Sequence, residues 1–99
     1  MSYRVRYTKA AREDLRRLYA FLLEQGIQAA QRARDAISKS IEYLREFPFT
    51  CRKAEHDNPF LREIVIPFGA FGYVALFEIE DSETVTILAI RHQREDDYY

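Results

Sequence analysis

Two apolar stripes at helical spacing, separated by one short break, most constrain the fold of this chain. Apolar residues recur every three or four positions over residues 9–24 and again over residues 28–46, a spacing typical of helices that bury one face. A short break that begins with Gln25-Gly26 separates them, so the sequence predicts an antiparallel helical hairpin in which Gly26 takes a left-handed cap. The first stripe contains Ala11, Leu15, Leu18, Tyr19, Leu22 and Leu23, and the second contains Ala30, Ala33, Ile37, Ile41 and Leu44.

Runs of β-forming residues flank this hairpin. Residues 3–7 alternate between aromatic or apolar and charged side chains, and three further runs cover residues 60–67, 73–79 and 84–92. The turns between the last three runs are short, which predicts an antiparallel meander. Residues 49–59 are expected to form a polar loop. Helices grouped between strands, without alternation, predict an α+β fold consisting of a strand, a helical hairpin and a three-strand antiparallel meander.

The length of 99 residues predicts one domain that spans residues 1–99. No apolar run approaches the ~18 residues that a membrane span requires. The first residues alternate in character and lack the apolar core of a signal peptide. A single cysteine, Cys51, can form no internal disulfide. Together these features predict a cytoplasmic protein without membrane association.

Charge divides the chain into a basic and an acidic half. Residues 1–53 carry twelve Lys or Arg against six Asp or Glu, whereas residues 54–99 carry three against ten. The basic, helical half indicates either an acidic partner or a nucleic-acid backbone, and an ordinary solvated helix surface is the alternative.

Several kinds of chemistry are missing from the sequence. It contains no Gly-rich phosphate loop, no cluster of Cys and His and no Ser nucleophile motif, and His56 and His92 are its two histidines. We therefore predict neither a metal site nor a cofactor.

Cationic groups gather where the last predicted strand ends, at Arg91, His92 and Arg94, with Tyr98 shortly after. A metal-independent site that cleaves RNA needs a base, an acid and cations for the phosphorane charge. His92 or Glu55 could serve as the base, and Arg62 or Arg91 could supply the charge.

Meander geometry argues against that site. The strands predicted at residues 60–67 and 84–92 run in the same direction on either side of a third strand. The start of one and the finish of the other therefore lie at opposite ends of the sheet. Arg62 and Arg91 are therefore not expected to form one compact cluster. The structural alternatives are pairing of these arginines with Glu63, Glu78 or Asp96 and, for His92, bonding to the backbone or to Glu95.

The ordered motifs of the chain resemble those of the RelE/ParE superfamily of toxins from bacterial type II toxin–antitoxin modules, often called plasmid stabilisation proteins. The motifs that carry the resemblance are Tyr-x-Val-x-Tyr-Thr-x-x-Ala at residues 3–11, Asp14-Leu15, Phe47-Pro48, Leu61-Arg62-Glu63, Ile66-Pro67-Phe68-Gly69, Gly72-Tyr73-Val74, and residues 87–95. The resemblance implies a cognate antitoxin with a disordered, often acidic segment that orders on the toxin. We expect this hetero-oligomeric partner to contact Arg12, Arg16, Leu23 and Phe71.

The superfamily divides by target. RelE-like members cleave mRNA on the ribosome, whereas ParE-like members are associated with poisoning DNA gyrase. The His92-Gln93-Arg94 ending looks ParE-like, so the resemblance predicts a gyrase-directed toxin that is not a nuclease, with Arg91, His92, Arg94 and Tyr98 binding the target. The alternatives are a ribosome-dependent endoribonuclease that uses Arg62, Arg91 and His92, and an inactive interaction module.

Overall fold

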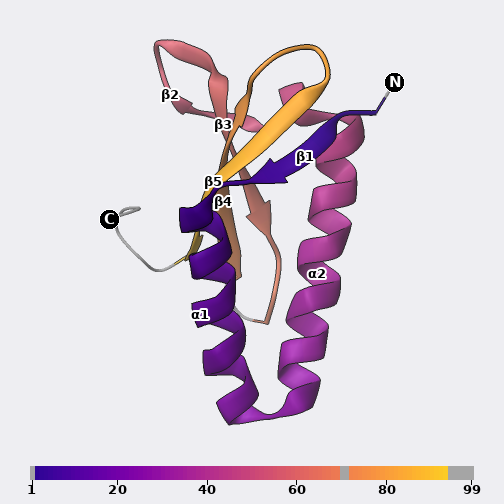
Figure 1. Cartoon of the computed structure of the whole chain (residues 1–99), viewed down its shortest axis with the longest axis vertical. Helices are drawn as coiled ribbons and strands as arrows, with labels where there is room; N and C mark the ends of the chain where they lie inside the picture. The colour runs from indigo at the N-terminus through magenta and orange to yellow at the C-terminus, as the bar shows by residue number, and fades with distance from the viewer. Residues whose placement is uncertain (1, 70–71, 94–99) are drawn as a thin grey trace.

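The structure is a computed structural model that describes residues 2–69 and 72–93 of the chain (Figure 1). Two long helices follow a short first strand, and the remaining strands come after them. In chain order the elements are β1 (Arg4–Tyr7), α1 (Lys9–Gln25), α2 (Ile27–Glu46), the 3-10 helix η1 (Pro48–Thr50), β2 (Arg52–Glu55), β3 (Asn58–Ile66), β4 (Tyr73–Ile79) and β5 (Thr84–His92).

All five strands form one sheet in the order β1-β5-β4-β3-β2. β1 pairs with β5 in parallel, and every other neighbouring pair is antiparallel. The two helices lie side by side along the sheet as an antiparallel hairpin (Figure 1). The predicted α+β fold is therefore confirmed, and the predicted bounds of β4 and β5 match the observed ones.

The polar loop predicted over residues 49–59 is wrong. This segment contains the end of η1, the strand β2 and the start of β3, and β2 pairs with β3 through Arg52 opposite Glu63 and Glu55 opposite Asn58. The meander therefore has four strands. Three of the four residues of β2 are exposed, because β2 is an edge strand and shows no apolar alternation. Charged side chains on an edge strand also prevent unwanted pairing with other chains.

α1 begins after Thr8 as its sequence predicts, whereas the connection to α2 differs from the predicted one. The hydroxyl of Thr8 accepts a hydrogen bond from the backbone amide of Ala11, as an N-cap residue does. Gly26 has φ 140° and ψ 148°, which is open to glycine but lies outside the predicted left-handed helical region. As a result, α2 begins at Ile27, directly after Gly26. Among the described residues, no helix has the length and apolar character that crossing a membrane requires.

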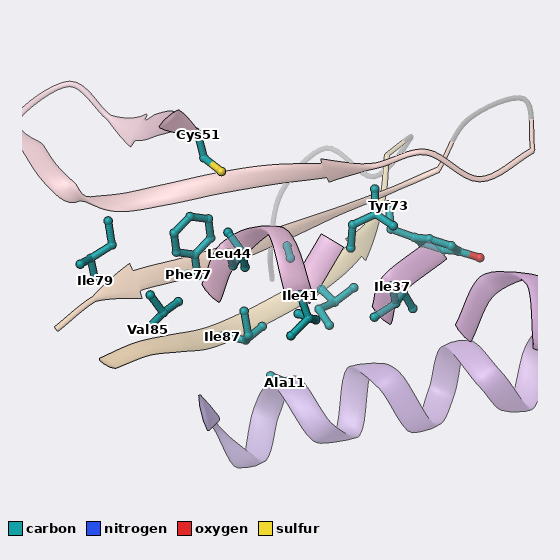
Figure 2. Packing of buried hydrophobic residues seen from close by; sticks show 13 residues of the cluster. Ala11, Ile37, Ile41, Leu44, Cys51, Tyr73, Phe77, Ile79, Val85 and Ile87 are labelled. Carbon is teal, nitrogen blue, oxygen red and sulfur yellow. The ribbon is translucent and has the colours of Figure 1, made fainter. Parts of the chain in front are cut away.

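The core lies between the helical hairpin and the sheet (Figure 2). All five residues of the predicted α2 stripe are buried, and Phe77 and Ile87 meet the helices from the sheet side. Complete burial of a side chain such as Leu44 or Phe77 contributes roughly 1.5–3 kcal/mol. The predicted α1 stripe holds except at Leu23, which is 55% exposed. The other stripe residues are buried or half-buried, whereas Leu23 lies outside the buried face of α1.

Candidate functional site

A bulge in β5 makes α1 and β5 meet through polar contacts. Leu76 pairs with Ala89 while Phe77 pairs with Ile87, so Leu88 is an additional residue in β5. The carbonyl of Leu88 accepts a hydrogen bond from the Thr8 hydroxyl at 3.1 Å. β1 ends opposite Ile87, so side chains from α1 and its cap take over the role of a neighbouring strand beyond that point.

Asp14 supplies the second of these contacts. Its side chain is 2% exposed, and its carboxylate accepts a hydrogen bond from the backbone amide of Ile90 at 2.8 Å. The guanidinium of Arg17 lies 3.3 Å from the same carboxylate. A buried charge needs such partners. From the sequence alone, no tertiary role is predicted for Asp14. The available signal was an acidic residue three positions after Ala11 and four before Leu18, within the apolar stripe.

A cleft of about 590 Å³ opens beside this contact, between α1 and the end of β5. Part of its wall is aromatic: Phe68 stacks on Tyr73, and the ring of His92 meets that of Tyr73 edge-on at 5.7 Å. Phe21 lies at the cleft and is 59% exposed. Polar groups from both elements complete the cleft. The residues that line it are Asp14, Arg17, Leu18, Phe21, Leu22, Gln25, Phe68, Gly69, Tyr73, Ile90, Arg91 and His92.

The structure places Arg91 and His92 together at this cleft but puts Arg62 elsewhere. Arg62 pairs with Phe77, whereas Arg91 pairs with Val74. Phe77 and Val74 are three residues apart on β4, so they point to opposite faces of the sheet. Arg62 and Arg91 therefore lie on different faces of the sheet with β4 between them. They are separated as expected, but by opposite faces of the sheet and not by the opposite strand ends on which the expectation rested.

Arg62 is occupied by the backbone of its own neighbourhood. Its guanidinium donates to the carbonyls of Pro59 at 2.6 Å, Cys51 at 2.8 Å and Phe49 at 3.2 Å. It also lies 5.4 Å from the centroid of the Phe49 ring. These contacts join β3 to the segment around η1. They replace the expected pairing with carboxylates.

Glu63, one of those expected partners, instead accepts a hydrogen bond from Arg52 at 2.9 Å. Glu55 pairs with Asn58 at the start of β3, whereas His92 pairs with Tyr73, which is opposite Ile66 at the end of β3. The two candidate bases are therefore at opposite ends of the sheet. The predicted positions Phe71, Arg94 and Tyr98 lie outside the described residues.

The predicted antitoxin contacts on α1 lie on another side of that helix. Arg12, Arg16 and Leu23 are exposed, and none of them lines the cleft. At about 100° per residue, they lie on nearly the opposite side of the helix from Asp14 and Phe21. Arg16 forms an ion pair with Glu13 at 2.9 Å. Their role in binding an antitoxin stays a prediction.

Over residues 2–69 and 72–93, no group of three or more His, Cys, Asp or Glu side chains is arranged to hold a metal ion. Burial raises the pKa of the Tyr73 hydroxyl above its ordinary value. The tyrosine at the cleft is therefore a neutral aromatic surface at physiological pH. The cleft offers an apolar binding surface with charged groups at its rim.

The sequence matches one family of known proteins and two of its named relatives. The family model described as ParE toxin of type II toxin–antitoxin system, parDE, matches residues 5–97. Toxin RelE3 of Caulobacter vibrioides is 35% identical over 85 residues, which cover 86% of this chain and 88% of that protein. Toxin RelE1 of the same organism is 32% identical over 92 residues, which cover 93% of this chain and 95% of that protein.

A solved structure described as the chromosomal ParDE TA system from P. aeruginosa has the same fold. It superposes with a TM-score of 0.67 at 18% identity, and the match covers 92% of this chain and 96% of that chain. At this identity the structural match speaks for the fold alone. The family model and the two relatives together show that the chain belongs to the ParE toxin family and is a toxin of a type II toxin–antitoxin system.

Proposed function

We propose that this toxin acts on DNA gyrase and that a cognate antitoxin neutralises it by occupying the cleft between α1 and β5. The observation that carries the choice of target is the placement of Arg62. Its guanidinium is bound to three backbone carbonyls, and its pairing with Phe77 puts it on the face of the sheet opposite Arg91. A nuclease site built from Arg62, Arg91 and His92 would need these groups around one phosphate.

The cleft has the character of a protein-binding surface. Phe21 is largely exposed beside the buried Leu22, and Arg17 and Gln25 lie at the rim. An apolar groove with polar edges suits an amphipathic segment that orders on binding. Such a segment would also cover Arg91 and His92. Neutralisation then follows from direct occlusion of two residues that we expect to contact the target.

The gyrase part of the proposal is tested with purified toxin and purified gyrase. We expect inhibition of supercoiling or accumulation of cleaved DNA, weakened in the variants Arg91→Ala and His92→Ala. Arg16→Ala is the matched control, because Arg16 is an exposed arginine on the other side of α1. An absence of any gyrase effect at micromolar excess, in a toxin that still arrests growth, contradicts the target. Harmless expression without antitoxin would instead support the inactive interaction module.

The antitoxin part is tested with two charged substitutions on α1. Phe21→Glu places a carboxylate in the cleft, whereas Leu23→Glu places one at a similarly exposed apolar position outside it. We expect Phe21→Glu to weaken antitoxin binding at least tenfold, as the loss of a buried aromatic anchor does, and Leu23→Glu to bind nearly normally. The reverse order would move the interface to the predicted contacts Arg12, Arg16 and Leu23.

A second candidate function is cleavage of mRNA on the ribosome. It is favoured by the two relatives, both of which carry the name of RelE toxins. Primer extension on cellular mRNA after induction separates the two functions. Cuts that disappear in the variants Arg91→Ala and His92→Ala would support the nuclease, whereas growth arrest with intact mRNA supports the gyrase-directed toxin.

A further inference from the structure

A second concave surface lies at the end of the sheet where the β4–β5 turn approaches β3. This groove encloses about 690 Å³ and shares no lining residue with the cleft at α1. Phe49 and Phe60 form its aromatic side, and Glu78, Glu80 and Asp81 form its acidic side. In Figure 1 the turn between β4 and β5 and the hairpin of β2 and β3 rise at the same end of the molecule.

The aromatic side is an exposed pair of rings. Phe49 and Phe60 meet edge to face with centroids 6.2 Å apart, and the two residues are 47% and 49% exposed. Phe49 already has the Arg62 guanidinium near its ring. The pair therefore shows, within the chain itself, how this surface receives a planar cation. Phe60 supplies the second exposed ring of the groove.

The acidic side is held in place by hydrogen bonds of its own carboxylates. Asp81 accepts a hydrogen bond from the backbone amide of Glu83 at 2.8 Å, and this bond is the main reason that the pKa of Asp81 lies below its ordinary value. Glu80 contacts the Thr86 hydroxyl through one carboxylate oxygen. Arg4 is the nearby cation that also lowers the pKa of Asp81, and its guanidinium donates to the Thr84 hydroxyl. Acidic residues remain in excess around the groove.

We propose that this groove docks a basic, arginine-bearing segment of a partner protein. A guanidinium can lie over an aromatic ring while its N–H groups bind carboxylates, and Phe60, Glu80 and Asp81 offer both kinds of contact in one groove. Nucleic acid is disfavoured, because the three carboxylates repel phosphate. This groove is therefore an interaction surface separate from the cleft at α1, and it goes beyond the proposed binding of antitoxin and gyrase.

The probe for this site is the acetylated and amidated peptide Gly-Arg-Gly-Arg-Gly, added to the full-length ¹⁵N-labelled protein. We expect amide shift changes concentrated at Phe60, Glu80 and Asp81. The variants Phe60→Leu, which keeps an apolar side chain, and Asp81→Asn, which keeps the acceptor for the Glu83 amide, should each weaken binding about two- to five-fold. The corresponding lysine peptide should bind more weakly, because an ammonium cannot lie flat on the ring and bind two carboxylates.

Glu24→Gln is the matched control, because Glu24 is an exposed acid near the end of α1 that does not line the groove. Unchanged affinity in Phe60→Leu and Asp81→Asn, or loss of affinity equal to that in Glu24→Gln, would overturn the proposal by reducing it to general attraction between charges. Shift changes at the groove that appear on concentrating the protein without peptide, together with dimers in sedimentation, would overturn it in favour of a second copy. Since gyrase and antitoxin are absent from the experiment, its result is independent of the proposed function.

Discussion

The buried carboxylate of Asp14 on α1 binds the backbone amide of Ile90 on β5 at 2.8 Å. This hydrogen bond joins residues that are 76 positions apart in the chain. Together with the contact from Thr8 to the carbonyl of Leu88, it satisfies the bulged part of β5 beyond the end of β1. The cleft proposed to bind the antitoxin opens directly beside it, so the same contact fixes the position of both cleft walls.

Replacing Asp14 tests the strength of this connection. Asp14→Ala leaves the Ile90 amide buried without its acceptor, and we expect the free energy of unfolding to fall by about 1–3 kcal/mol. Asp14→Asn retains an acceptor oxygen and should lose less. Urea unfolding measures both. Glu13→Ala, next to it on the exposed side of α1, should change stability by no more than about 0.5 kcal/mol; an equal loss at both positions would refute the specific role of Asp14.

Arg62 is expected to stabilise the folded state. In Arg62→Ala the carbonyls of Phe49, Cys51 and Pro59 lose a charged donor, and the free energy of unfolding should fall by about 1.5–3 kcal/mol. Arg62→Lys should recover little, because one ammonium cannot reach the three acceptors as the planar fork does. Lys53→Ala, exposed on the paired strand, is the control in thermal unfolding. Wild-type stability in Arg62→Ala would contradict the structural role.

Replacing Gly72 by alanine should destabilise the fold more than replacing Gly69. A Cβ at Gly72 would lie 2.4 Å from the carbonyl oxygen of Ile66, and the backbone there has φ 111°. At Gly69, with φ 61°, a Cβ would meet no heavy atom within 4 Å. We expect Gly72→Ala to destabilise by at least ~2 kcal/mol and Gly69→Ala by about 1 kcal/mol. Denaturant unfolding of the two variants compares them directly, and equal losses would disagree with the close approach at Gly72.

Alkaline pH should destabilise the fold through three tyrosines, of which Tyr73 is buried and Tyr7 and Tyr19 are half-buried. Burial raises the pKa of Tyr7, Tyr19 and Tyr73 above the ordinary value of 10.0, and Arg45 partly opposes this at Tyr7. The folded state thus holds these protons more tightly than the unfolded state. The stability is fully present below pH 10 and is lost as pH rises through the folded-state pKa values. Urea midpoints measured across this range should fall, and less steeply in Tyr7→Phe; a flat profile would contradict the prediction.

Apolar spacing alone was sufficient to predict the helical hairpin, the strands β4 and β5 and the α+β class, because periodicity reports which face of an element is buried. The strand β2 was missed for the same reason. It is an exposed edge strand with charged residues, so burial left no pattern in its sequence. The cationic residues Arg91 and His92 were found from the sequence, and their place at a cleft came from the structure.

The partners of the polar groups were decided by the tertiary structure. Whether Arg62 meets a carboxylate, a phosphate or three carbonyls depends on how the segment around η1 folds over β3. Whether Asp14 is a surface acid or a buried acceptor depends on one additional residue in β5, Leu88. The sequence by itself determined which apolar face of each helix and of the central strands leaves water. Strand register and the bulge determined which of them meet, because a shift of one residue turns every side chain to the other face of a sheet.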